Sequence, residues 1–193
     1  MKKNEEIIDL LLKAGASFET SPKGLSPFHC FFKGNYCNTE FIKKILNNIN
    51  VPISEWINQK DEEGNTPLLI ELLYGGGDFD RLKFLLENGA SLEVKNNKGQ
   101  TPILLAAKCA LQPNVFPQLY DPKHAHDEDN EGNNLLHYAL EAQQCTIRVL
   151  KWIYEHKAIT NKKNSKGLDP LKIAANHCQT SEVMKLLEQY LNK

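Results

Sequence analysis

The chain has 193 residues, 41% of them hydrophobic, and its 23 basic and 24 acidic residues give a formal net charge of −1. The hydrophobic fraction allows a substantial core. Because the charges are balanced and form no block of one sign, the sequence predicts no charged surface that would bind nucleic acid or an anionic membrane. The five cysteines include no C-x-x-C pair, which argues against a disulfide framework or a cysteine zinc site and favours a reducing compartment.

The N-terminal residues predict a single helix without a partner. Residues 5–16 have helical apolar spacing, and the mostly apolar run within them covers only residues 7–12. That run is too short for a signal peptide or a membrane span, so we expect a cytoplasmic protein. Because no first helix precedes residues 5–16, the array either begins with a half-repeat or belongs to a longer protein.

Five glycines divide the rest of the chain at spacings of 40, 35, 33 and 35 residues. Two residues after each glycine, a proline- or leucine-centred tetrad opens an apolar helix. A repeat of this period is typical of a stacked solenoid. The glycines are Gly24, Gly64, Gly99, Gly132 and Gly167, and the tetrads begin at Ser26, Thr66, Thr101, Asn134 and Asp169.

Residues 61–96 show the local signals of one repeat most clearly. We expect Gly64 to adopt a positive φ in the opening turn and Thr66 to cap the first helix with its hydroxyl. Three successive glycines then separate this helix from a second one over residues 79–88, which Gly89 closes as a C-terminal cap.

Residues 64–90 resemble an ankyrin repeat, because they open with Gly-x-Thr-Pro-Leu and close with Leu-Leu-x-x-Gly-Ala. Partial matches recur at residues 8–16, 101–107, 136–139, 169–175 and 183–187. The resemblance implies an all-α solenoid of paired antiparallel helices with short β-hairpin-like turns, in a single array over residues 1–193. The expected parts are a partial N-terminal repeat 1–20, the repeats 21–60, 61–95, 96–128 and 129–163, and a C-terminal capping repeat 164–193.

Two places depart from the regular repeat. An insertion around residues 50–56 lengthens the first unit and carries Trp56, which either pins the insertion to the stack or is offered to a partner. In the third unit Pro117 stands where the second helix should run. We therefore expect a short or distorted helix between residues 113 and 121, followed by a loop. Trp152, at an apolar helical spacing, is expected in the core.

Two clusters have the composition of a metal site. An exposed acidic loop is the interpretation we favour for the first, and the second lacks a required ligand. His124 and His126 are followed by three carboxylates that can ligate a divalent ion. Residues 127–138 begin like a calcium-binding loop, but Tyr138 occupies the position of the bidentate carboxylate.

Histidine–cysteine neighbours are equally poor candidates for catalysis. The pairs at residues 29–30 and 177–178 are adjacent in sequence, and adjacent helical residues point about 100° apart. His29 and His137, in the tetrads, are expected to hydrogen-bond neighbouring turns. We therefore expect no catalytic residue, no metal and no cofactor.

The resemblance also marks the positions that contact a partner on the concave face: the two residues before each glycine, the one after it, and the ninth and tenth beyond it. Tyr74 is the expected anchor, because it is large, amphipathic and next to a flexible turn. With Trp56 from the insertion, the candidate protein-binding residues are Trp56, Glu62, Glu63, Asn65, Leu73, Tyr74, Lys98, Gln100, Lys108, Glu131, Asn133, Glu141, Lys166, Leu168 and His177.

The leading functional hypothesis is a non-catalytic, monomeric protein-interaction module whose concave face binds another protein. It predicts no nucleic-acid and no membrane partner. Two alternatives remain open: the chain is the recognition domain of a larger enzyme or of a secreted bacterial effector acting in the host cytosol, or the irregular third unit belongs to a hydrolase or metalloprotein.

Overall fold

Short helices joined by turns make up the described part of the chain, whose only β pairing is a single bridge between Glu128 and Asn134. This confirms the predicted all-α class. The computed structural model describes residues 10, 14, 24–33, 37–49, 52–109, 116–142, 147–158, 161–177 and 180–192. The expected partial repeat 1–20 therefore lies outside the described residues, except for Leu10 and Ala14. The chain divides into two units, Met1–Ser91 and Leu92–Lys193, each with its own buried apolar residues.

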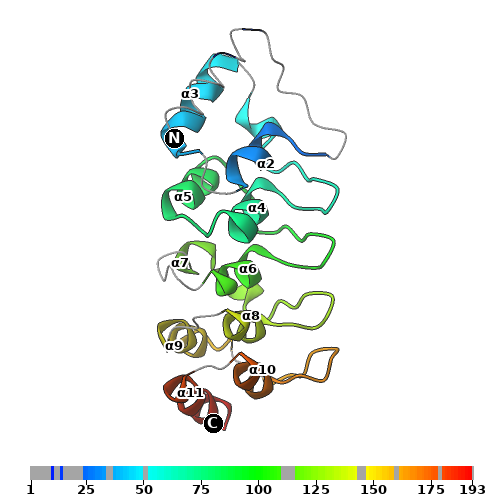
Figure 1. The fold of residues 1–193 in the computed structure, drawn as a ribbon, viewed down its shortest axis with the longest axis vertical. Coiled ribbons are helices and arrows are strands. Elements are labelled where there is room, and N and C mark those ends of the chain that lie inside the picture. Colours follow the sequence, from blue (N-terminus) through cyan, green and yellow to red (C-terminus); the bar gives the residue numbers. More distant parts are fainter. Residues whose placement is uncertain are drawn as a thin grey trace. The chain divides into compact units, whose positions relative to one another are not determined.

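In the first unit the helices pack in pairs (Figure 1). Helix α4 (Pro67–Tyr74) packs on α5 (Phe79–Glu87) and on α2 (Pro27–Phe32), and α3 (Thr39–Ile49) packs on α5. A 3-10 turn, η1 (Ile53–Glu55), lies between α3 and α4. The helix predicted over residues 79–88 is present one residue shorter, and Gly89, at φ 87°, closes it as expected.

The second unit continues this pattern with α6 (Pro102–Lys108), α7 (Phe116–Leu119), η2 (Pro122–His124), α8 (Leu135–Glu141), α9 (Ile147–Glu155), α10 (Pro170–Asn176) and α11 (Ser181–Leu191). Helices α6, α8 and α10 pack in a row, and α9 packs on α11 beside them (Figure 1). The turns that precede the first helices therefore follow one another along one side of this unit.

The first helices begin where predicted, but the capping role expected of Thr66 is wrong. Thr66 precedes Pro67, the first residue of α4, yet its hydroxyl is buried without a hydrogen-bond partner among the described residues. In α8, by contrast, Asn134 accepts from the backbone N–H of His137 at 3.2 Å, and the histidine ring completes the reciprocal capping box. Leu69 occupies the equivalent position in α4 and cannot return such a bond.

The two tetrad histidines hydrogen-bond the next turn, as predicted. His29 Nε2 donates to the Asn65 carbonyl at 2.9 Å, and His137 Nε2 donates to the Leu168 carbonyl at 3.2 Å. Both side chains are buried, and burial lowers the pKa of His137. The two rings thus join consecutive repeats within each unit.

The insertion of the first unit is held against the stack. The Trp56 indole is 7% exposed, and its ring centroid lies 5.7 Å from that of Phe28. Asn58 donates to the Gly89 carbonyl at 2.9 Å and accepts from the Ser91 amide at 2.8 Å. Of the two alternatives for Trp56, the structure therefore shows the pinned one.

The third repeat is irregular in the way that Pro117 predicts. Its second helix, α7, has only four residues, and the 3-10 turn η2 follows within the expected loop. Trp152 of α9 is half-buried, with ring centroids 4.9 Å from Phe116, 4.7 Å from Tyr120 and 3.9 Å from His156. Aromatic packing thus replaces part of the missing helical contact.

Candidate functional site

Four of the described turns share one feature, a side-chain acceptor three residues before Gly64, Gly99, Gly132 or Gly167. In the second repeat, Asp61 accepts from the backbone amides of Glu63 at 3.0 Å and Asn65 at 2.7 Å. The same two bonds are made by Asn96, Asp129 and Asn164 in their turns. An Asp or Asn that accepts from the backbone two residues on stabilises such turns. This recurring Asp or Asn is visible in the sequence but was not among the predicted site residues.

These turns hold a groove in the second unit, with a volume of about 520 Å³. It runs between the turns and the ends of the first helices, and most of its side chains are charged or amides. It brings together the seven predicted residues Lys98, Gln100, Lys108, Glu131, Asn133, Glu141 and Lys166. Asp129 and Tyr138 also line it and were not predicted as binding residues.

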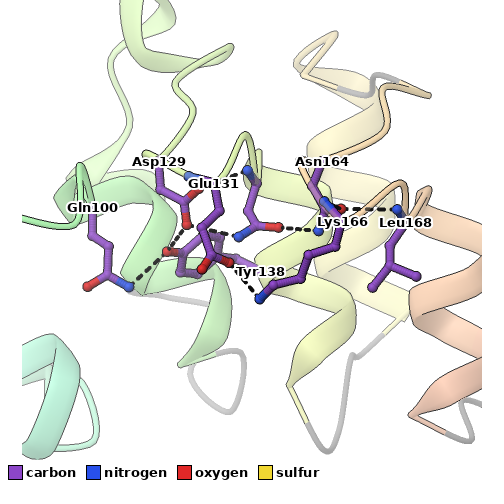
Figure 2. Close-up of polar contacts among 8 residues, drawn as sticks. Gln100, Asp129, Glu131, Tyr138, Asn164, Lys166 and Leu168 are labelled. Carbon is purple, nitrogen blue, oxygen red and sulfur yellow. Dashed lines mark hydrogen bonds and ion pairs between the residues drawn. The ribbon is translucent and has the colours of Figure 1, made fainter.

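A hydrogen-bond chain crosses the groove floor (Figure 2). Gln100 Nε2 donates to the Tyr138 hydroxyl at 2.8 Å, and that hydroxyl donates to Asp129 Oδ2 at 2.8 Å. Burial raises the pKa of Tyr138, so the phenol stays neutral and keeps donating. These hydrogen bonds fix the third and fourth turns relative to α8.

The same series of hydrogen bonds continues towards the fifth repeat. The Asn133 amide donates to Asp129 Oδ2 at 3.0 Å, and the Asn164 amide donates to Asn133 Oδ1 at 2.8 Å (Figure 2). Lys166 Nζ lies 2.8 Å from Glu131 Oε2 at the surface. Because Asn133 is 7% exposed, it positions the turns and has little surface to offer a partner.

The first unit has a smaller pocket, of about 220 Å³, near the end of α4. Tyr74 is 50% exposed there, and Lys33 Nζ lies 5.4 Å from the centroid of its ring. The predicted residues Glu62 and Glu63 also line this pocket. An exposed aromatic ring beside carboxylates can contact both the apolar and the charged part of a partner's side chain.

Four other predicted residues line neither hollow. Asn65 is buried and bonded within its turn, and Leu73 is half-buried on α4. Leu168 is half-buried, while His177 is exposed at the end of α10. Like the buried Trp56, these residues lie outside both the groove of the second unit and the pocket of the first.

A buried ion pair supports the Tyr74 end of α4. Glu71 Oε2 lies 2.8 Å from Arg81 Nη2, and both side chains are almost fully buried. Glu71 Oε1 accepts from the Asp78 amide at 3.0 Å, and Arg81 donates to the Phe31 carbonyl at 3.0 Å. Burial raises the pKa of Glu71 to about 7, and the attraction of Arg81 opposes this only in part.

The histidine cluster of the third repeat contacts carboxylates of its own loop and of the preceding repeat. His124 Nδ1 lies 2.9 Å from Asp127 Oδ2, and His124 Nε2 lies 3.2 Å from Glu93 Oε2. Lys123 pairs with the same Glu93 and, at 3.0 Å, with Asp121. Over the described ranges, no group of three His, Cys, Asp or Glu residues is arranged to hold a metal ion. No helix in these ranges has the length and apolar content to cross a membrane.

Comparison with known proteins relates part of the chain to a repeat family. Residues 69–158 match the family described as ankyrin repeats (3 copies). The chain is also similar to a Caenorhabditis elegans protein named intracellular phospholipase A2, with 28% identity over 142 residues; the match covers 69% of this chain. It spans only 13% of that relative's length.

The family match agrees with the repeat spacing and with the stacked helix pairs, and repeats of this family generally mediate protein–protein interaction. The resemblance seen in the sequence is therefore confirmed over residues 69–158, which match the ankyrin-repeat family.

Proposed function

We propose that this chain is a non-catalytic protein-interaction module that holds a protein partner against the turns and first helices of its repeats. The observation that carries the proposal is the groove of the second unit, where seven residues marked by family resemblance line one hollow of about 520 Å³. Its volume is typical of binding sites. Its charged and amide lining suits a polar protein segment better than an apolar small molecule.

The rigidity of the groove supports the same function. The Asn130 amide donates to the Lys98 carbonyl at 3.0 Å, and the Ser165 amide donates to the Glu131 carbonyl at 2.8 Å, so each turn is bonded to the next. A surface that is ordered before binding loses less conformational entropy on association. Tyr74, in the first unit, adds an exposed aromatic side chain of the kind that dominates binding energy at interfaces.

The charges of the chain support a protein partner over other classes. Acidic and basic side chains alternate around the groove, whereas a phosphate backbone or an anionic membrane requires a basic surface. The proposal therefore includes a monomer that binds neither nucleic acid nor membrane. The five cysteines without a C-x-x-C pair support a cytoplasmic location.

Affinity capture with a matched pair of variants tests the proposal. Lys98→Glu/Lys108→Glu reverses two charges in the groove, while Lys151→Glu/Lys185→Glu makes the same change on exposed positions of α9 and α11. We expect the first variant to lose proteins that the parent and the control variant retain, with the same circular dichroism spectrum in all three. Equal capture by both variants would contradict the proposed surface.

A second candidate function is that of a recognition domain within a larger enzyme. The match to a protein named intracellular phospholipase A2, of which this chain spans 13%, favours it. An antibody against this chain would test it by immunoblot of the source cells. A band far above 21.9 kDa supports the larger protein, and a single band near that mass contradicts it.

A further inference from the structure

We propose that the groove of the second unit accepts a polypeptide segment carrying one carboxylate and one cation about 10 Å apart. The carboxylate faces Lys98 and Lys108, and the cation faces Glu141. This inference rests on the proposed function, because it names the chemistry of the partner that the groove selects.

The sign of the groove's charge reverses from one repeat to the next. Lys98 stands before the turn glycine of the third repeat, and Lys108 is the ninth residue after that glycine. Glu131 and Glu141 occupy the same two positions of the fourth repeat. All four side chains line the same hollow, so two lysines on one repeat adjoin two glutamates on the next.

The two pairs of charges lie within reach of one segment. The third and fourth turns are joined by the bond from the Asn130 amide to the Lys98 carbonyl, and α6 packs directly on α8. Packed helices lie about 8–10 Å apart. An extended chain covers about 10 Å in three residues, so its acidic and basic side chains are separated by two to four positions.

Three of these charges remain available to a partner. Lys98 and Lys108 are exposed, Glu141 is half-buried, and none of the three forms an ion pair with another described residue. Glu131 is already paired with Lys166, and Asp129 accepts bonds from the Tyr138 hydroxyl and the Asn133 amide. The open sites are thus two cations on one repeat and one carboxylate on its neighbour.

This order also selects against other partners. A uniformly acidic segment, or a nucleic-acid strand, that reaches Lys98 and Lys108 brings further negative charge against Glu141. A uniformly basic segment that reaches Glu141 brings further positive charge against Lys98 and Lys108. The groove therefore favours a segment in which both signs occur.

A charge-exchange experiment tests the order directly. The probes are 12-residue peptides selected from a random displayed library on the parent chain, and the tightest binder resynthesised with its acidic and basic residues exchanged. The variant Lys108→Glu/Glu141→Lys exchanges the charges at the ends of α6 and α8 at constant net charge, and Lys151→Glu/Glu188→Lys makes the same change on exposed positions of α9 and α11.

We expect the parent and the control variant to bind the selected peptide about tenfold more tightly than its exchanged form, and Lys108→Glu/Glu141→Lys to lose that preference. Selected peptides without paired charges, an unchanged preference in Lys108→Glu/Glu141→Lys, or tighter binding of a 12-nucleotide DNA strand would overturn the inference alone. Failure to select any peptide above background would count against the proposed function as well.

Discussion

Replacing Gly75 by alanine should destabilise the first unit, although the local backbone favours the change. Gly75 ends α4 in the right-handed helical region, at φ −84° and ψ −7°, where alanine is normally preferred. A Cβ atom there, however, would overlap the buried carboxylate of Glu71. The carboxylate must move away from the Asp78 amide and from Arg81, which lies beside it.

The structure sets the size of the effect. Alanine gains about 1 kcal/mol over glycine from helical preference. Displacing Glu71 loses its bond to the Asp78 amide, worth about 1.5–3 kcal/mol for a charged acceptor, and the overpacking itself costs about 1–3 kcal/mol. The lost hydrogen bond and the overpacking are not fully additive, because both arise from the displacement of the Glu71 side chain. We therefore expect a net loss of about 2 kcal/mol in the free energy of unfolding.

Urea denaturation followed by circular dichroism measures this loss as a lower midpoint at an unchanged m-value. In a Glu71→Ala background the overlap is gone, so Gly75→Ala should then cost nothing or stabilise. Gly76→Ala is the matched control, because Gly76 has φ 76° and open space around it, and its cost should be the same in both backgrounds. A Gly75→Ala variant as stable as the parent would refute the assigned role of Glu71.

Three further predictions concern buried groups and one turn. Burial raises the folded-state pKa of Glu71 from 4.5 to about 7, so the folded chain binds this proton more tightly than the unfolded chain. The free energy of unfolding should therefore fall by about 3 kcal/mol as the pH rises from 4.5 to about 7. Glu71→Gln should remove this fall, as measured by urea denaturation at about pH 4.5, 6 and 8. Tyr138→Phe, which loses the bonds to Gln100 and Asp129, should cost about 1–2 kcal/mol in the same assay. Gly99→Ala, whose Cβ would overlap the Asn130 side chain, should destabilise more than Gly167→Ala, which has a similar φ and open space.

The helices could be predicted because their signals are local. Gly64, Gly99, Gly132 and Gly167 adopt φ values of 71–76°, a region that other residues avoid, so the glycine spacing locates the turns. Proline before an apolar run likewise marks a helix start, and Pro117 correctly indicated the short α7. Each of these effects depends on the residue and its immediate neighbours.

The interactions that join distant residues could not be predicted in the same way. Nothing near Tyr138 in the sequence indicates that its hydroxyl meets Gln100, 38 residues away. The Glu71–Arg81 pair depends on how α5 folds back on α4, and the pattern alone places a carboxylate at the surface. Thr66 shows another limit of the pattern, because it stands at the start of α4 as predicted but its hydroxyl caps no backbone N–H.

The same difference between local signals and long-range packing applies to the predicted binding residues. Family resemblance marks positions, and the structure brings seven of them to one groove. It does not distinguish exposed members of the set, such as Lys108, from buried ones that hold the turns, such as Asn133. That distinction requires the packing of neighbouring repeats. The binding role of the exposed residues stays a prediction.

Site-specific photo-crosslinking tests the central claim most directly. A photoreactive amino acid replaces Lys108 in the groove or, as the control, Lys151 on α9, and each chain is irradiated in an extract of its source cells. We expect the groove position to form a covalent adduct with a specific protein, and excess unmodified chain to compete it away. Adducts that form equally from both positions, or only from Lys151, would contradict binding through the groove.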